Sequence, residues 1–207
     1  MIRQLLVALM LLLALPAWAN DKVLRYEITP FAGYRFGGSF EDDETGQDYD
    51  LDDDKAYGFI VNMMAEANTQ WEFGWSRSET AVDVPSVNGS PDKLDLDIDY
   101  FQAGGTYLWD GKRAQPFMVA TVGAAHLNPD SSGDSETYFA FSIGGGWRLF
   151  PSEHFGLRVE GRFYGTVLDS DSDVFCRTGP DNNQCLIQSQ AEILWQWQMF
   201  AGASFRF

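Results

Sequence analysis

Charged residues that alternate with apolar residues are the feature of this 207-residue chain with the clearest chemical potential. In the segment RVEGRF (158–163), for example, arginine and glutamate take every second position. Because successive side chains of a β-strand point to opposite faces, this spacing places the charges on one face. The residues that share the pattern are Glu27, Arg35, Glu72, Arg148, Arg158, Glu160, Arg162, Glu192 and Arg206. Guanidinium and carboxylate groups on one face can pair with each other through charge-assisted hydrogen bonds.

Acid–base or nucleophilic chemistry would have to use one of the two histidines, His126 and His154. The polar residues that follow His126 are Asp130, Ser131, Ser132 and Asp134. These residue types could form a hydrolase site, but the polarity of a surface loop explains them equally well. The chain contains no G-x-S-x-G, H-E-x-x-H or phosphate-loop motif. We therefore expect no enzyme and assign no catalytic residue.

The segment 37–54 could bind divalent cations, because clustered carboxylates suit Ca²⁺. Its acidic residues are Glu41, Asp42, Asp43, Glu44, Asp48, Asp50, Asp52, Asp53 and Asp54. The stretch DYDLDDDK (48–55) lacks the glycine and the closing glutamate of an EF-hand loop, so we expect an extended, solvated loop without metal or other cofactor. The net charge of −16 for the whole chain argues against nucleic acid as a partner.

A two-residue periodicity reveals the elements that must position these groups. In the terminal segment 190–207, Trp195 and Trp197 share one face, whereas Gln196, Gln198 and Arg206 share the other. This arrangement is the inverse of a water-soluble barrel strand. It indicates a strand with one face toward lipid and one toward a polar lumen.

Seven earlier segments are also expected to be strands, and all but segment 115–127 show a similar alternation. The expected strands are 23–36, 55–67, 71–76, 94–109, 115–127, 137–150, 155–168 and 190–207. Pro30 predicts a β-bulge or locally open pairing, and a change of phase near Tyr100 predicts a β-bulge. The phase of segment 115–127 stays unassigned. The longer connections are expected at 37–54, 80–93, 128–136 and 169–188. We therefore predict an all-β fold, an eight-stranded antiparallel up-and-down transmembrane β-barrel with side chains filling its interior.

Residues 1–19 are expected to be a signal peptide. Arg3 precedes an apolar stretch from Leu5 to Leu15, and Ala17-Trp18-Ala19 forms a cleavage pattern. The stretch is too short for a membrane-spanning helix, which needs about 20 residues. An uncleaved anchor is the alternative. Residues 20–207 are expected to form a single outer-membrane barrel domain.

The two cysteines, Cys176 and Cys185, lie in a polar segment of this exported chain. We expect them to form a disulfide, because disulfides persist in oxidising compartments. No histidine or further cysteine lies near them in the sequence, so a metal site is not expected.

The chain resembles the small eight-stranded outer-membrane β-barrels, a porin-type family that includes the OmpA transmembrane domain and OmpX. The resemblance spans all residues after the signal peptide and rests on YFQAGGTYLWD (100–110), YFAFSIGGGWRLF (138–150) and the terminal FAGASFRF (200–207). It implies a Gram-negative outer membrane, with both termini in the periplasm and the long loops outside. It also implies contact with membrane lipid and lipopolysaccharide. The barrel-assembly machinery would read the terminal strand with Phe205 and Phe207.

Members of such a family include pores, adhesins and lipid-modifying enzymes, so the fold alone does not decide the activity. We expect a structural or surface-interaction role, with an unidentified host or surface ligand, and an inward salt-bridge lattice that fills a narrow barrel. A narrow gated pore for small solutes, whose ion pairs exchange partners, is the second interpretation. The alternative is a lipid A-modifying enzyme that resembles the deacylase barrels, which keep a His–Ser pair near the outer end of a strand. His126 would serve there, although Leu127 and Asn128 follow it and not a serine.

Overall fold

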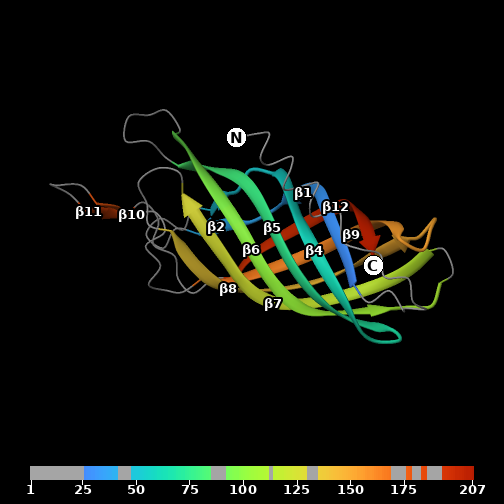
Figure 1. Cartoon of the computed structure of the whole chain (residues 1–207). Helices are drawn as coiled ribbons and strands as arrows, with labels where there is room; N and C mark the ends of the chain where they lie inside the picture. The colour runs from blue at the N-terminus through green and yellow to red at the C-terminus, as the bar shows by residue number, and fades with distance from the viewer. Residues whose placement is uncertain are drawn as a thin grey trace, which may run out of the picture.

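Eight long antiparallel strands form a closed barrel in the computed structural model (Figure 1). The structure describes residues 26–41, 48–84, 92–111, 114–129, 135–168, 176–178, 183–185 and 193–207. The barrel strands are β1 (Tyr26–Phe36), β4 (Asp54–Glu66), β5 (Thr69–Val84), β6 (Asp92–Leu108), β7 (Ala114–Pro129), β8 (Glu136–Leu149), β9 (Phe155–Val167) and β12 (Ile193–Arg206). Each strand pairs with the next barrel strand along the chain, and β12 returns to pair with β1. The predicted all-β, eight-stranded up-and-down topology is therefore confirmed.

The two ends of the barrel differ in their connections. At one end, which we call the turn end, short segments join β4 to β5, β6 to β7 and β8 to β9. Both ends of the barrel chain lie there, because the N–H groups of Tyr26 and Phe207 each donate to the other residue's carbonyl, at 3.2 and 3.0 Å. The opposite end, which we call the loop end, is where β1, β5, β7 and β9 finish. Within the described residues, no helix is long and apolar enough to cross a membrane.

Two short hairpins lie outside the barrel wall. One pairs β2 (Ser39–Glu41) with β3 (Asp48–Asp50), and the other pairs β10 (Cys176–Thr178) with β11 (Asn183–Cys185). The first hairpin corrects the prediction of an extended loop over 37–54. Gly37 and Gly38 leave β1 with positive φ angles of 78° and 112°, which glycine tolerates without steric cost. Leu51 then becomes buried, and its N–H donates to the carbonyl of Gly38 at 2.9 Å.

The outer face of the wall is apolar over most of its height. Large side chains that are exposed on it include Trp71, Phe73, Phe101, Val122, Ile143, Trp147, Val159, Trp197, Met199 and Phe205. They alternate with buried positions, as a strand between two different environments requires. Exposed apolar surface of this extent is unusual in soluble proteins and suits contact with lipid.

The polarity of the wall reverses near the loop end. Leu96, Ile98 and Tyr100 point inward and are at most 1% exposed, whereas Asp95 on the opposite face is exposed. The inward cluster contains Leu51, Leu96, Ile98, Tyr100, Ala125, Leu127, Tyr138, Ala140, Tyr164, Leu168 and Leu194. Apolar inside and polar outside is the arrangement of a barrel in water. Along its length the wall thus changes from an apolar outer face, which we call the lipid-type wall, to a polar outer face over an apolar interior, which we call the water-type wall.

The β5–β6 ladder corrects two predictions. Residues 80–93 were expected to form a loop, but the ladder continues to the pair Val84↔Asp92. A β-bulge was expected near Tyr100, but the register runs unbroken through Ser76↔Tyr100. The change of phase in the sequence has another cause: the apolar residues move from the outer to the inner face where the wall changes type.

Pro30 produces the open pairing that its position predicts. On one side β1 pairs with β4 through Pro30↔Phe59, but on the other side the pairing with β12 skips Thr29 and Pro30. The gap follows because proline has no backbone N–H to donate. The proposed signal peptide at 1–19 lies outside the described residues.

Candidate functional site

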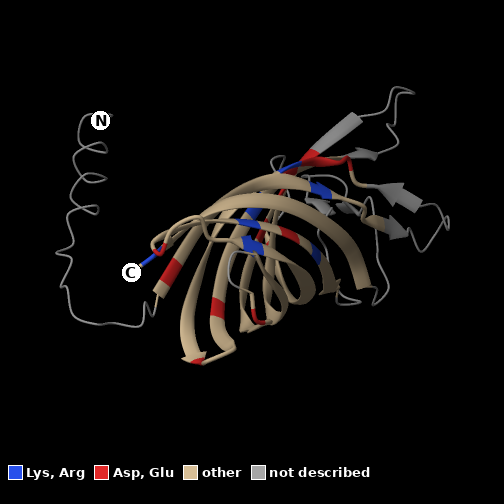
Figure 2. Cartoon of the chain, turned by 90° about the vertical axis from the view of Figure 1, so that its right-hand side faces the viewer, with Lys and Arg blue, Asp and Glu red and all other residues tan. Residues whose placement is uncertain are grey.

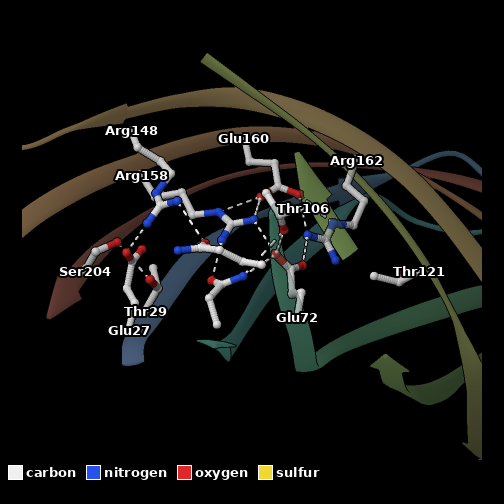
Figure 3. A network of polar contacts seen from close by, with 12 residues as sticks. Glu27, Thr29, Glu72, Thr106, Thr121, Arg148, Arg158, Glu160, Arg162 and Ser204 are labelled. Carbon is white, nitrogen blue, oxygen red and sulfur yellow. Dashed lines mark hydrogen bonds and ion pairs between the residues drawn. The ribbon is translucent and has the colours of Figure 1, made fainter. Parts of the chain in front are cut away.

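The barrel interior contains a ring of buried ion pairs (Figure 3). Arg158 Nη2 lies 2.9 Å from Glu72 Oε2 and 2.6 Å from Glu160 Oε2. Arg162 Nη2 lies 2.7 Å from Glu72 Oε1 and 2.5 Å from Glu160 Oε1. Each carboxylate therefore bridges both guanidinium groups, and every side chain in the ring is at most 3% exposed.

Strand geometry explains how the ring is assembled. Arg158, Glu160 and Arg162 alternate along β9, so their side chains share its inner face. Glu72 reaches them from β5, on the other side of the lumen in strand order. Asn62 Nδ2 and Thr106 Oγ1 donate to Glu72 Oε2 at 3.0 and 2.7 Å. These extra donors satisfy the carboxylate, which offsets part of the large cost of burying a charge.

A second ion-pair group lies near the turn end. Glu27 contacts Arg148, and its Oε2 accepts a hydrogen bond from Arg206 Nε at 2.9 Å. Arg148 Nη1 donates to Gln70 Oε1 at 3.0 Å. The ring of Phe150 lies against the guanidinium groups of Arg206 and Arg148, with centroid distances of 3.2 and 5.3 Å. Basic and acidic positions are thus interspersed on the strands, as the view from this end shows (Figure 2).

Arg35 is buried among neutral partners. Its Nη1 donates to Ser78 Oγ and its Nη2 to Ser76 Oγ, both at 2.7 Å, and Nη2 also donates to Gln198 Oε1 at 2.7 Å. Its Cζ lies 4.6 and 5.2 Å from the ring centroids of Tyr100 and Tyr164. Among the described residues, no carboxylate lies within ion-pair distance of this guanidinium.

Little free space remains between these groups. An interior cavity of about 10 Å³ is lined by Phe31, Ile60, Gly74, Trp75, Ser76, Tyr100, Gln102, Arg162, Tyr164 and Phe200. This volume corresponds to about one water molecule. Two further inward clusters are apolar and consist of Phe31, Ile60 and Phe200, and of Leu108, Phe117 and Val119. The interior is therefore a packed, layered core.

The model of the family described as outer membrane protein beta-barrel domain matches residues 5–185. The chain belongs to this family. Similar solved structures include Neisserial surface protein A, at 11% identity and a TM-score of 0.60 over 88% of this chain and 97% of that one. OprG from Pseudomonas aeruginosa has 14% identity and a TM-score of 0.58 over 90% and 97% of the two chains. AlkL in DMPC bilayers has 16% identity and a TM-score of 0.54 over 93% and 95%.

The solved structures establish the fold, and together with the family match they indicate the bacterial outer membrane as the location, but no particular activity. No curated protein matches the chain. Function must therefore be argued from the side chains of this outer-membrane barrel.

Most residues singled out from the sequence fall at defined places in this outer-membrane barrel. Glu27, Arg35, Glu72, Arg148, Arg158, Glu160, Arg162 and Arg206 all point inward, whereas Glu192 lies outside the described residues. Phe205 and Phe207 are half-exposed at the turn end. Cys176 and Cys185 are opposite each other in the backbone register of β10 and β11, and their disulfide remains a prediction. The acidic residues at 42–47 also lie outside the described part.

His126 lies on the outer face of β7, where the apolar surface ends. Its Nδ1 is 2.9 Å from Thr137 Oγ1, and the register places it opposite Asp99. The Asp99 carboxylate, however, accepts hydrogen bonds from Arg77 Nε at 2.9 Å and from Trp75 Nε1 at 3.0 Å. Asp99 therefore binds Arg77, and the described residues do not form a relay from an acid through His126 to a nucleophile. The polar residues at 130–134 lie outside the described part of the chain.

Sequence reasoning missed the residues that complete these interior groups. Ser76, Ser78 and Gln198 surround Arg35, and Asn62 and Thr106 complete the Glu72 site. The inward phase of Asn62 and Gln198 is visible in the sequence, because both alternate with outward apolar neighbours, whereas Ser78 lies between Arg77 and Glu79. The contacts of these five residues are not visible in the sequence, because the contacts depend on how the strands stagger when the barrel closes.

Proposed function

We propose that the protein is a non-enzymatic outer-membrane barrel that acts as a closed, rigid anchor for a surface-interaction role. The observation that carries the proposal is the filled interior. The Glu72–Arg158–Glu160–Arg162 ring, the Arg35 group and the apolar loop-end cluster occupy successive positions inside the wall. A barrel filled in this way holds its shape without offering a water-filled path.

In this proposal the loop end faces the outside of the cell and the turn end faces the periplasm. The water-type wall at the loop end supports this orientation, because β5 and β6 continue there beyond the apolar surface. The lipid-type wall would contact outer-membrane lipid and lipopolysaccharide. Phe205 and Phe207, at the turn end, would be available to the barrel-assembly machinery during folding. The ligand of the outer surface is left open.

Planar-bilayer recording tests the closed interior. The full chain, refolded and inserted into a bilayer, should give flat traces across a wide voltage range, because the buried ring leaves no continuous aqueous path. A general porin inserted under the same conditions should give current steps and serves as the positive control. Reproducible steps from this protein would replace the anchor by the narrow gated pore.

A His126→Ala variant tests the absence of enzymatic activity. Lipid A from cells that express the wild type or the variant should have the same acyl pattern by mass spectrometry, because Asp99 binds Arg77 and no carboxylate within the described residues contacts His126. Cells without the protein provide the baseline. An acyl pattern that changes with the wild type and reverts with His126→Ala would favour a lipid A-modifying enzyme.

A further inference from the structure

Among the fully buried inward groups that the structure describes, there is one guanidinium group more than there are carboxylates. Among the described residues, the inward groups that are at most 2% exposed are Arg35, Arg148, Arg158 and Arg162 against Glu27, Glu72 and Glu160. The excess charge belongs to Arg35, whose hydrogen bonds all go to neutral oxygens. Asp54 is opposite Arg35 in the register but is only half-buried and accepts a hydrogen bond from its neighbour, Lys55 N, at 2.5 Å. Buried charges are normally paired, so this imbalance calls for a negative partner.

The small interior cavity described above lies directly against Arg35 and the side chains that contact it. Three residues that line it, Ser76, Tyr100 and Tyr164, also contact Arg35. A fourth lining residue is Arg162, whose guanidinium belongs to the ion-pair ring. The cavity is therefore placed between two buried positive charges.

The polar groups around the cavity are donors without a complete set of acceptors. Gln102 is 6% exposed, and its Nε2 has no hydrogen-bond partner, whereas its Oε1 accepts from Thr121 Oγ1 at 2.6 Å. Glu72 and Glu160 contact Nε and Nη2 of Arg162, and Nη1 takes no part in these ion pairs. Ser76 Oγ accepts from Arg35, so its own proton is free to point elsewhere.

We propose that this cavity binds one small monovalent anion, for which chloride is the abundant candidate, on the donors of Gln102, Arg162 and Ser76. A water molecule could accept these hydrogen bonds but would leave the Arg35 charge uncompensated. A cation would be repelled by both guanidinium groups, and a ligand that carries a carboxylate or phosphate is larger than the cavity. The anion would complete the charge balance of the interior.

Unfolding of the full chain in detergent tests the site. Sodium gluconate is replaced stepwise by sodium chloride at constant ionic strength, and the unfolding transition is followed by circular dichroism. Chloride that binds only the folded barrel should have no effect well below its dissociation constant and should shift the transition upward with the logarithm of the chloride concentration above it. The ratio of folded to unfolded protein should rise about tenfold when chloride exceeds its dissociation constant about tenfold. No shift, or a shift of the same size in the variant that fills the cavity with a carboxylate, would overturn the proposal.

A pair of matched variants separates the site from general screening. In Gln102→Glu, a carboxylate takes the place of the amide and provides the negative charge within the chain. This variant should lose the chloride response and be as stable in gluconate as the wild type is in chloride. The control Gln70→Glu puts the same charge into the same lumen, beside Arg148 and not at the cavity, and should keep the response.

A third variant keeps the test decisive if Gln102→Glu does not fold. Ser76→Ala removes one donor from the cavity, and an acceptor of Arg35, with little change in volume. It should raise several-fold the chloride concentration above which the stabilisation begins. Line broadening of the chloride resonance in NMR should follow the same order, strongest in the wild type and in Gln70→Glu. If both glutamate variants lose the response, or neither does, the effect is not local to this cavity and the proposal fails.

Discussion

Glu72 is the residue on which most contacts of the ion-pair ring converge. It is fully buried and accepts hydrogen bonds from Arg158 at 2.9 Å, Arg162 at 2.7 Å, Asn62 at 3.0 Å and Thr106 at 2.7 Å. In a low-dielectric interior a carboxylate with this many donors is held in place by its surroundings. Its removal leaves two guanidinium groups with Glu160 as their shared counter-ion.

Substitution Glu72→Gln should therefore destabilise the barrel strongly. Removing one partner of a buried ion pair costs about 3–5 kcal/mol, because the remaining charges stay buried without compensation. Urea unfolding of the refolded protein in lipid vesicles would measure the loss. The control is Glu79→Gln on the outer face of β5, where the side chain is exposed and a change within about 0.5 kcal/mol is expected. Equal effects for the two variants would show that the ring does not stabilise the fold.

The sequence predicts which residues face inward better than it predicts their partners. Arg158, Glu160 and Arg162 have the same spacing as any strand with one polar face, so their inward direction is readable. The neutral surroundings of Arg35 cannot be read from the sequence, because Ser76 and Gln198 come from strands far away in the sequence. An arginine on a polar face predicts a lumen position but does not reveal whether its partner is an acid, a hydroxyl or an aromatic ring.

At the scale of the strand, the sequence left a phase unassigned or misled where one face contains two kinds of environment. The inner face of β7 is apolar at Phe117 and Val119 and again at Leu127, with Thr121 between them. Met118 and Val122 are apolar on the outer face, so neither face of this strand stands out in the sequence. The structure assigns the odd-numbered positions to the interior. The same mixture on β6 caused the false prediction of a β-bulge.

The glycines of β8 and β9 allow a strand-level prediction. Gly146 points inward opposite Glu160 in the register, and a Cβ at this position would overlap the Val159 carbonyl oxygen and lie 2.9 Å from the Glu160 Cα. Gly161 points outward on β9, and an added Cβ would meet nothing within 4 Å. The two positions therefore differ in space, although the sequence shows a glycine at each.

Gly146→Ala should destabilise the barrel by about 1–3 kcal/mol, the usual cost of overpacking an interior. Gly161→Ala should be neutral or stabilise it by up to about 1 kcal/mol, because it only restricts the unfolded chain. The shift of the barrel band between heated and unheated samples on a gel, followed against urea, would rank the variants. A larger loss for Gly161→Ala would contradict the assignment of the two faces.

At the scale of the whole molecule, the wall is longer than a membrane requires. A transmembrane β-strand needs about 9–11 residues, whereas β5 and β6 contain 16 and 17. The excess lies at the loop end, where Leu96 and Ile98 point into the barrel and Asp95 and Asp97 point away from it. The barrel thus combines a segment built for lipid with an extension built for water. This division explains why a single rule of apolar-out alternation described most strands but not the upper part of β6.

Labelling of intact cells would locate the boundary between these two segments and the side of the membrane on which the extension lies. Asp95→Cys places a thiol on the outer face of the extension, and Val122→Cys places one on the outer face of the apolar wall, where the side chain is 55% exposed in the absence of lipid. A charged maleimide that does not cross membranes should label the first variant in intact cells and leave the second unlabelled, because lipid covers it.

The protein without an added cysteine controls for reaction at Cys176 and Cys185. Both variants should react after unfolding in denaturant, which shows that each thiol is present and reduced. If Asp95→Cys reacts only after the outer membrane is broken, the extension faces the periplasm and the proposed surface role is wrong. If Val122→Cys reacts in intact cells, lipid does not cover the apolar wall.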